Sequence, residues 1–406
     1  MVSAAHSKSI FQSETAKLIL LVFLAFFLPT SIEGEQIEAI WGAINAVLIG
    51  VVCLQLASQH GFNRFVTIAA IAVLVALCVS SLIVLIGKAG DFSTARFAPT
   101  FIVLAVFSLR TGSVRIRRET AIRLIDILAL VIIAWNLLAL VRFEPLISFV
   151  EKYYIQLDDY TATEYSLLVG KPVFTFGVHN FASVFYFFIF YCASKIYFQD
   201  GYKRMLIYSA ALFVFTLLLA STAAYGTAAI MIAAFAYELW YRKTVSIKWL
   251  MVLLAPVIIA LILLNPATIE RLLLSENGFI ARYASNNLYA GNSAFLMEYP
   301  LGAGFTIPSS SKVYFADSGF WIYLTMGNVS LLCGLFALFF FYVKKNVHEK
   351  DDRIYLIVSY LTAELSFSSF LYWKTIVLLI ISVVILNALS KKKKSKKDSS
   401  LSANRG

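Results

Sequence analysis

The sequence predicts an all-α protein that crosses a membrane about twelve times. The chain has 406 residues, of which 60% are hydrophobic and 14% are charged, whereas water-soluble proteins carry about 25% charged residues. Its apolar residues are gathered into long runs, and most of its Lys and Arg residues lie between those runs. A water-soluble core cannot hold this much apolar sequence, so lipid must solvate part of the chain.

The individual spans follow from length, because a helix needs about 20 apolar residues to cross the hydrocarbon core. The first run is interpreted as a membrane helix rather than a cleavable signal peptide, since Glu33 and Glu35 follow it in place of a small-residue cleavage site. The fourth, seventh and twelfth runs are short or closely connected, which gives a range of about eleven to thirteen spans. In chain order, the expected helices are 16–31, 39–58, 65–87, 97–110, 124–142, 180–198, 205–221, 223–241, 248–265, 318–342, 353–371 and 373–390.

These helices are expected to form one transmembrane domain over residues 1–390. Residues 391–406 are predicted to be a basic, disordered cytoplasmic tail. The cysteines do not suggest a second kind of domain, because all of them lie inside apolar runs without metal-ligand spacing. They are Cys53, Cys78, Cys192 and Cys333.

The distribution of charge predicts the orientation, because Lys and Arg accumulate in short cytoplasmic loops. With the basic tail placed in the cytoplasm, 25 of the 34 Lys and Arg residues fall on the cytoplasmic side. Both termini are then cytoplasmic, in the inner membrane of a bacterium. The net charge of +11 is thereby interpreted as a topology signal, and no nucleic-acid partner is expected.

Two connections, 143–179 and 266–317, are much longer than is usual between helices. The predicted orientation puts both in the periplasm. Both keep many apolar residues among their charges, so they are expected to be partly helical and to fold onto the membrane domain. Because the cytoplasmic connections are short and basic, any functional site is predicted at the outer face.

Arg271 and Arg282 in the second long loop are unusual cations on the predicted outer side. A guanidinium is always charged and binds phosphate oxygens in pairs. The alternative is that each arginine reaches lipid headgroups or pairs with Glu270 or Glu276.

Other candidates lie where helices are expected to begin at the outer face. His179 is suited to proton transfer near neutral pH, and Asn180 beside it is a candidate ligand or an ordinary helix cap. Tyr225 belongs to a small-residue hairpin that either packs helices or presents a hydroxyl to a cavity. Asp317, followed by Ser318, is either a base or sugar ligand, or an acidic cap of the next helix.

Glu364 is the clearest acid within a predicted span, and such residues are functional hypotheses. Lys374 is its expected partner across a short outer turn, either as a structural pair or as part of a proton path. The sequence has no P-loop, GxGxxG, HExxH or GxSxG motif. ATP-driven pumping and serine or zinc hydrolysis are therefore unsupported, and no cofactor or metal is expected.

Residues 170–330 resemble bacterial O-antigen polymerases and the related O-antigen ligases. The family typically has an Arg, then a Pro-Leu-Gly-x-Gly-Phe-like turn, then a polar residue that opens a helix with a Gly-containing turn at its end. The upstream residues 176–182 look like the family's Asn-containing helix start. The matching residues are Arg282-Tyr283, Pro300-Leu301-Gly302-Ala303-Gly304-Phe305, Asp317-Ser318-Gly319-Phe320 and Gly327-Asn328.

This resemblance implies a GT-C-like membrane glycosyltransferase that acts without a metal and inverts the donor sugar. The donor would be an undecaprenyl-pyrophosphate-linked glycan and the acceptor a second lipid-linked unit, with a chain-length regulator and a flippase as further partners beside the membrane lipids. Arg282, helped by Arg271, would hold the pyrophosphate, and His179 or Asp317 would act as base. Asn180, Tyr225, Tyr283 and Ser318 are expected to contact substrate.

Two departures from the family pattern affect this prediction. Ligases commonly have a His-Asn pair where Asp317 and Ser318 stand, which favours a polymerase. Many members have a Ser-Arg pair where this chain has Ser221-Thr222, which leaves one fewer cation for a pyrophosphate. An O-antigen ligase that uses lipid A-core as acceptor, and a lipid-linked oligosaccharide flippase, remain the alternatives.

Overall fold

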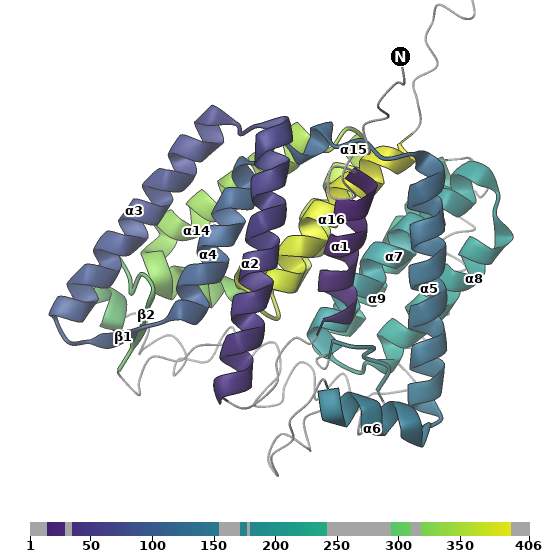
Figure 1. The fold of residues 1–406 in the computed structure, drawn as a ribbon, viewed down its shortest axis with the longest axis horizontal. Helices are drawn as coiled ribbons and strands as arrows, with labels where there is room; N and C mark the ends of the chain where they lie inside the picture. The colour runs from purple at the N-terminus through teal and green to yellow at the C-terminus, as the bar shows by residue number, and fades with distance from the viewer. Residues whose placement is uncertain are drawn as a thin grey trace, which may run out of the picture.

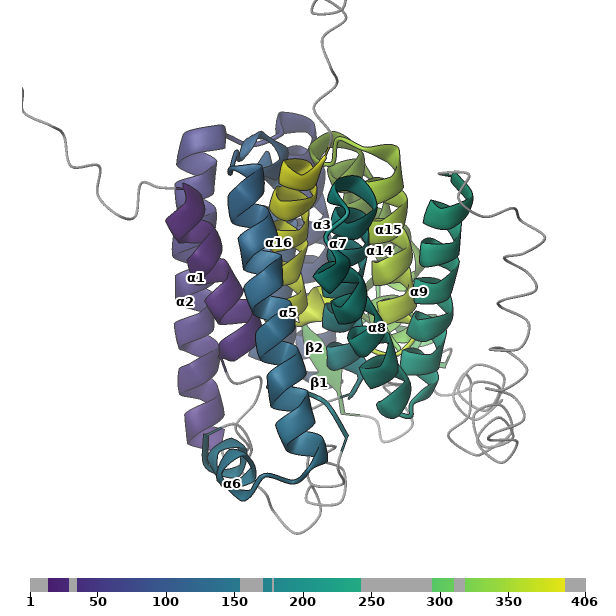
Figure 2. The same ribbon diagram turned by 90° about the vertical axis from the view of Figure 1, so that its right-hand side faces the viewer.

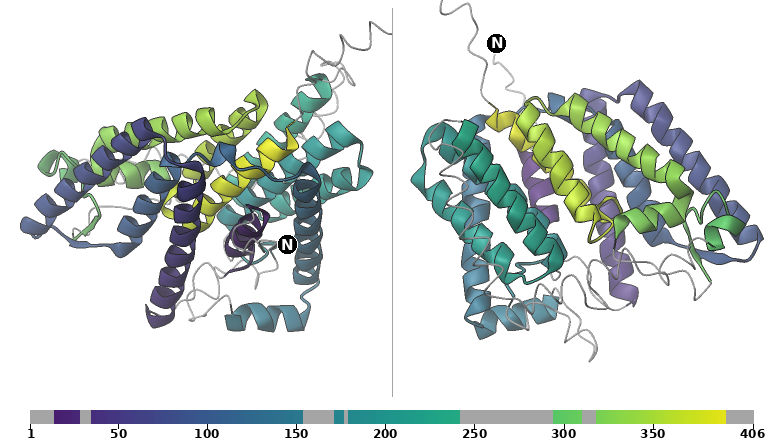
Figure 3. Two further views of the ribbon diagram at one scale, coloured as in Figure 1. Left: turned by 45° about the horizontal axis from the view of Figure 1, so that its top comes forward. Right: turned by 180° about the vertical axis from the view of Figure 1, so that it is seen from behind.

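The computed structural model describes residues 14–28, 35–153, 171–176, 179–241, 294–309 and 318–390. These residues form a bundle of long helices that run roughly side by side (Figures 1 and 2). Views from other directions show the same arrangement (Figure 3). The helices are α1 (Glu14–Phe27), α2 (Glu35–His60), α3 (Arg64–Ile86), α4 (Thr94–Ser108), α5 (Arg118–Leu140), α6 (Glu144–Tyr153), α7 (His179–Asp200), α8 (Lys203–Leu218), α9 (Thr222–Tyr241), α14 (Gly319–Asn346), α15 (Lys350–Glu364) and α16 (Trp373–Leu389), with short 3-10 helices η2 (Thr111–Ser113) and η4 (Ser369–Leu371).

The helices agree in position with the predicted spans. Each predicted span that falls on described residues overlaps one long helix, whereas 248–265 lies outside them. Among the described helices, five are long and apolar enough to cross a membrane, and further apolar helices such as Thr94–Ser108 and Trp373–Leu389 are shorter. The prediction of an α-helical membrane protein is thereby supported. The five are Arg64–Ile86, Arg118–Leu140, His179–Asp200, Ala223–Trp240 and Gly319–Asn346.

Apart from α6, helices that are joined by a described connection run in opposite directions, so these connections alternate between the two ends of the bundle (Figure 1). We call the end with connections 61–63, 109–117, 201–202 and 347–349 the basic end. The end with connections 87–93, 141–143, 219–221 and 365–372 is the loop end. Basic residues gather in and beside the connections of the basic end, namely Arg64, Arg110, Arg115, Arg117, Arg118, Lys203, Arg204, Lys344, Lys345, Lys350 and Arg353.

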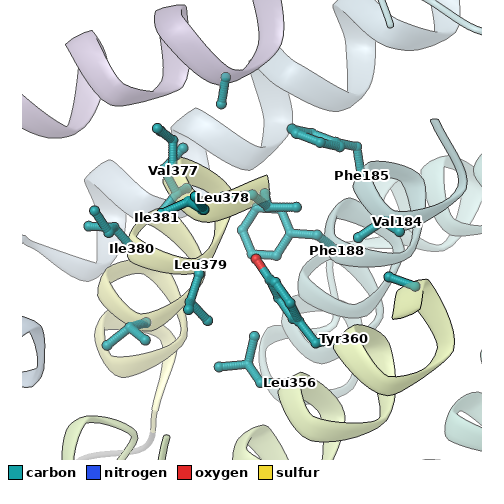
Figure 4. Close-up of a cluster of buried hydrophobic side chains, with 14 of the residues drawn as sticks. Val184, Phe185, Phe188, Leu356, Tyr360, Val377, Leu378, Leu379, Ile380 and Ile381 are labelled. Carbon is teal, nitrogen blue, oxygen red and sulfur yellow. The ribbon is translucent and has the colours of Figure 1, made fainter. Parts of the chain in front are cut away.

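Helices α7 and α16 form the centre of the bundle. Of the most apolar 18-residue stretch of each helix, 89% is buried in α7 and 28% is buried in α3. On α3, the side chains of Phe65 and Ile68 are both 69% exposed. The exposed apolar face of α3 is what a lipid-facing helix requires, since lipid solvates apolar side chains. Val184, Phe185 and Phe188 of α7 meet Leu356 and Tyr360 of α15 and residues 377–381 of α16 (Figure 4). Both central helices begin at the loop end, so the first residues of α7 and α16 are held in place there by the most deeply buried part of the bundle.

The fold also contains a small antiparallel sheet, which the all-α prediction did not include. Strand β1 (Gly90–Phe92) pairs with β2 (Thr306–Pro308), and Asp91 lies opposite Ile307. Each strand has three residues, which is too short to leave a period-two pattern in the sequence. The pairing joins the α3–α4 connection to the segment before α14. Helix α6 lies across the loop end, within the first long loop that was predicted to be partly helical (Figure 1).

Candidate functional site

The predicted site residues divide between described and undescribed parts of the chain. Arg271, Arg282, Tyr283 and Asp317 lie outside the described residues, so the structure says nothing about their geometry. His179, Asn180, Tyr225 and Ser318 are described. All four lie at the loop end, where α7, α9 and α14 begin.

Asn180 and Ser318 meet on the turn formed by residues 364–372, which connects α15 to α16. The Nδ2 of Asn180 donates to the carbonyl oxygen of Ser366 at 3.4 Å. The hydroxyl of Ser318, which is buried, donates to the carbonyl oxygen of Glu364 at 3.1 Å. Two stretches that are distant in sequence are therefore held on one short turn, and His179 is the neighbour of Asn180 at the start of α7.

Ser318 stands at the N-cap of α14 but does not cap it with its side chain. A serine at this position usually accepts a hydrogen bond from the first turn of the helix. Here its hydroxyl is directed to Glu364 instead. Ser318 therefore links the start of α14 to the turn, a role that the helix-cap interpretation does not describe.

Tyr225 lies in the first turn of α9 and is partly buried. Its backbone N–H donates to Ser221, and the hydroxyl of Ser221 accepts the N–H of Ala224 at 3.2 Å. Ser221 is thus an N-cap, as the packing interpretation of this hairpin expects. Among the described residues, no hydrogen bond joins Tyr225 to the turn that holds Asn180 and Ser318.

Glu364 is the buried polar centre of this end of the molecule. Its Oε1 accepts hydrogen bonds from the hydroxyl of Tyr323 at 3.0 Å, from the hydroxyl of Ser369, and from the N–H of Phe370 at 3.3 Å. The Oε2 has no hydrogen-bond partner among the described residues. One oxygen is therefore held by the turn and by α14, while the other remains available.

Gly319 explains how this carboxyl fits against α14. A Cβ on Gly319 would collide with the Oε2 of Glu364 and would lie 2.9 Å from the Cα of Ser368. Only glycine leaves room for the carboxyl group beside the first turn of the helix.

The expected pair of Glu364 and Lys374 does not form. The Nζ of Lys374 has no hydrogen-bond partner among the described residues, although the residue is only 2% exposed. It lies 5.3 Å from the ring centre of Phe176 and 5.7 Å from that of Trp373. The prediction was wrong because the turn supplies Glu364 with nearer donors, from Tyr323, Ser369 and the backbone.

The turn of residues 300–305, which we call the glycine turn, is docked onto α14. The N–H groups of Ala303 and Gly304 donate to the carbonyl oxygens of Thr325 and Met326 at 2.8 and 2.7 Å. Immediately after Met326, α14 is kinked, with φ of −150° at Gly327 and +59° at Asn328. The Nδ2 of Asn328 donates back to Pro300 at 3.0 Å.

Glycine is required at two positions of the glycine turn. Gly302 has φ +84° and Gly304 has φ +59°, a region that L-residues rarely adopt. A Cβ on Gly302 would lie 2.5 Å from the Met326 carbonyl oxygen, and one on Gly304 would collide with Ser81 and Leu77 of α3. The glycines of the Leu-Gly-x-Gly-Phe motif therefore have a structural role in joining this turn to α14 and α3.

The segment after the glycine turn is fixed as well. The N–H of Phe305 donates to the hydroxyl of Ser81 at 2.7 Å, and the buried guanidinium of Arg96 donates to the carbonyl oxygen of Thr306 at 2.7 Å. Arg96 is one of the cations that the charge count put on the outer side, and here it serves the loop backbone. The second long loop consequently returns to the bundle at a defined place.

Sequence reasoning missed the groups that bind the Glu364 carboxyl. Tyr323 follows Gly319 by four residues and so lies on the same face of α14, and Ser369 is in the Ser-rich stretch Ser366-Phe367-Ser368-Ser369. Both signals were present but weak, because hydroxyl residues are common in membrane helices. In the described part of the chain, no group of three His, Cys, Asp or Glu side chains is arranged to hold a metal ion.

Comparison with known proteins gives no relative for this chain. No protein-family model matches it, no curated protein matches it, and no solved structure matches it.

Proposed function

We propose that this protein polymerises undecaprenyl-pyrophosphate-linked oligosaccharide repeat units at the outer face of a bacterial inner membrane. In this proposal the chain is a GT-C-like enzyme of about twelve spans, with both termini in the cytoplasm. The loop end then faces the periplasm, which is consistent with the positive-inside rule and the position of the basic end. The product would be O-antigen or a related surface polysaccharide.

One observation carries the proposal. Asn180 and Ser318 belong to the two separate stretches that resemble the polymerase family, and both hydrogen-bond to the turn that contains Glu364. The resemblance gave no information about distances, so this meeting is independent support. The second stretch is further supported by the glycine turn, which contacts Met326 beside the Gly327–Asn328 kink.

The proposed chemistry uses no metal and draws its energy from the donor bond. The acceptor hydroxyl oxygen attacks the anomeric carbon of the donor, and the bond from that carbon to the pyrophosphate oxygen breaks. His179 or Asp317 takes the hydroxyl proton, and undecaprenyl pyrophosphate leaves with the bonding electrons. Arg282, helped by Arg271, would stabilise the negative charge that develops on the leaving group. Asn180, Tyr225 and Tyr283 would position the sugars, whereas the buried Ser318 would hold the start of α14 against the turn.

The decisive experiment supplies purified protein with a lipid-linked repeat unit and resolves the products by length. The proposal expects a ladder of polymers from the wild type and none from Arg282→Ala. Arg142→Ala is the control, because Arg142 is an exposed arginine at the loop end of the bundle. A normal ladder from Arg282→Ala would remove Arg282 from the mechanism, and the absence of any ladder from the wild type would contradict a polymerase.

The same assay separates the alternatives. A ligase would transfer a single glycan to lipid A-core and would form no ladder from the lipid-linked unit alone. A flippase would leave the lipid-linked repeat unit chemically unchanged. It would be expected to place charge deep in a central cavity, whereas the central helices α7 and α16 pack against each other and against α15 through apolar side chains (Figure 4).

A further inference from the structure

Lys374 carries a buried amino group that has no hydrogen-bond partner in the described structure. The residue is 2% exposed, and its Nζ has no hydrogen-bond partner among the described residues. Its two aromatic neighbours, Phe176 and Trp373, offer ring faces within 6 Å. Ring faces attract a cation, but they do not replace the acceptors that an ammonium group loses when it leaves water.

The start of α16 also makes this an unfavourable place for a lysine without a partner. Lys374 lies in the first turn of α16, where the helix dipole disfavours a cation, and that turn contains no acidic residue. A helix start presents N–H groups that have no partner within the helix.

Glu364 does not neutralise this region. Its Oε1 is bound by Tyr323, Ser369 and the N–H of Phe370. Its Oε2 faces the start of α14 at Gly319. This carboxyl group therefore lies against the start of α14, and no carboxylate in the described part of the chain contacts the Nζ of Lys374.

We propose that Lys374, together with the backbone N–H groups at the start of α16, binds a phosphate group at the loop end of the bundle. In the setting of the proposed function, on which this part rests, the phosphate belongs to the pyrophosphate of the lipid-linked donor. A phospholipid headgroup offers the same chemistry. A charged phosphate oxygen supplies the acceptor that Nζ lacks, and helix starts bind such groups through backbone N–H donors.

The test measures binding by the full-length protein in phosphatidylcholine nanodiscs. The probes are farnesyl pyrophosphate, inorganic pyrophosphate and farnesol, with phosphatidylglycerol as a competing lipid. Lys374→Met should weaken farnesyl pyrophosphate binding by about tenfold or more, the effect of losing one charge-assisted hydrogen bond. Lys88→Met, which removes an exposed lysine at the same end, should bind as the wild type does, and farnesol should not bind at this site.

A second readout distinguishes binding from a structural role. Without ligand, Lys374→Met should unfold at the wild-type temperature or above, because it removes a buried polar group that has no hydrogen-bond partner. A large fall in its Tm would assign Lys374 to the packing of α16 and would overturn the inference. Lys374→Arg keeps the charge and should keep binding more than Lys374→Met does.

Three further measurements, namely lipid competition, dissociation constants and polymer formation, also decide whether Lys374 binds phosphate. Competition by phosphatidylglycerol that depends on Lys374 would support the phosphate site and identify a headgroup as its source. Equal dissociation constants for the wild type and Lys374→Met would overturn the site. Lys374-dependent binding by a protein that makes no polymer would contradict only the proposed function, whereas a full ladder with unchanged donor affinity in Lys374→Met would contradict only this inference.

Discussion

The hydroxyl of Tyr323 on α14 donates a 3.0 Å hydrogen bond to Oε1 of Glu364 at the end of α15. Both side chains are fully buried. The bond links two helices through a polar contact inside an otherwise apolar bundle. It also fixes the end of the turn on which Asn180 and Ser318 meet.

Removing this hydroxyl should destabilise the protein. Tyr323→Phe leaves the ring in place and deletes two hydrogen bonds of the hydroxyl, one to the buried carboxyl of Glu364 and one from the N–H of Phe370, which is expected to lower the free energy of unfolding by about 1–3 kcal/mol. Thermal unfolding in detergent measures the change. Tyr202→Phe, at a tyrosine that is 46% exposed, should have almost no effect, and an unchanged Tm for Tyr323→Phe would show that these bonds contribute nothing.

The glycine turn should be intolerant of any side chain. Gly302→Ala combines a positive φ, which costs about 1–2 kcal/mol, with a Cβ that would lie 2.5 Å from the Met326 carbonyl oxygen. Gly201→Ala is the matched control, since Gly201 has φ +75° but no atom within 4 Å of the added Cβ. We expect a clearly larger fall in Tm for Gly302→Ala. Equal losses would mean that the turn does not depend on its contact with α14.

At the basic end, an ion-pair network joins α7 to α15. Lys195 is buried and lies 2.7 Å from Asp352 and 2.6 Å from Glu349. Lys195→Met leaves the carboxylate of Asp352 buried without its partner, which is expected to cost about 3–5 kcal/mol.

The control for this prediction is a second ion pair. Arg204 contacts Asp126 at 3.0 Å, but its side chain is 56% exposed, so Arg204→Met should cost under about 1 kcal/mol. The double variant Lys195→Met/Asp352→Leu should recover stability relative to Lys195→Met. Chemical denaturation of the purified variants provides the comparison, and a double variant no more stable than the single one would contradict the pairing argument.

The orientation of the bundle can be tested with single cysteines in a background whose native cysteines are replaced by alanine. A membrane-impermeant thiol reagent added to spheroplasts should label Lys88→Cys, which lies in an exposed loop-end connection. It should label Ser113→Cys, exposed at the basic end, only after the membrane is permeabilised. The reverse pattern would place the loop end in the cytoplasm and would remove the basis for chemistry at the outer face.

The places of the helices could be predicted from sequence because lipid imposes a simple requirement. Each span needs enough consecutive apolar residues to cross the hydrocarbon, and this leaves a strong local signal. Residues 180–198 and 373–390, for example, were predicted close to the observed α7 and α16. Which helices are central was not predicted, because α3 and α7 are both apolar enough to span a membrane, and how much of each is buried depends on the helices that pack around it.

The candidate site could be predicted only in part. Asn180 and Ser318 were selected by their places at helix starts, and the structure brings both to one turn. The partner of Glu364 was predicted wrongly. Lys374 is close to Glu364 in sequence, but the geometry of the turn directs Ser369 and the N–H of Phe370 to the carboxyl instead.

By itself, the sequence determined that this chain is an α-helical membrane protein with its basic residues gathered in alternate connections. Those properties depend on composition and spacing, which are local. Only the tertiary structure decided that Tyr323 binds Glu364, that the glycine turn docks beside the kink of α14, and that Lys374 is buried without a partner. Hydrogen bonds and burial depend on which segments meet in space, and the positions of those contacts leave no periodic mark in the sequence.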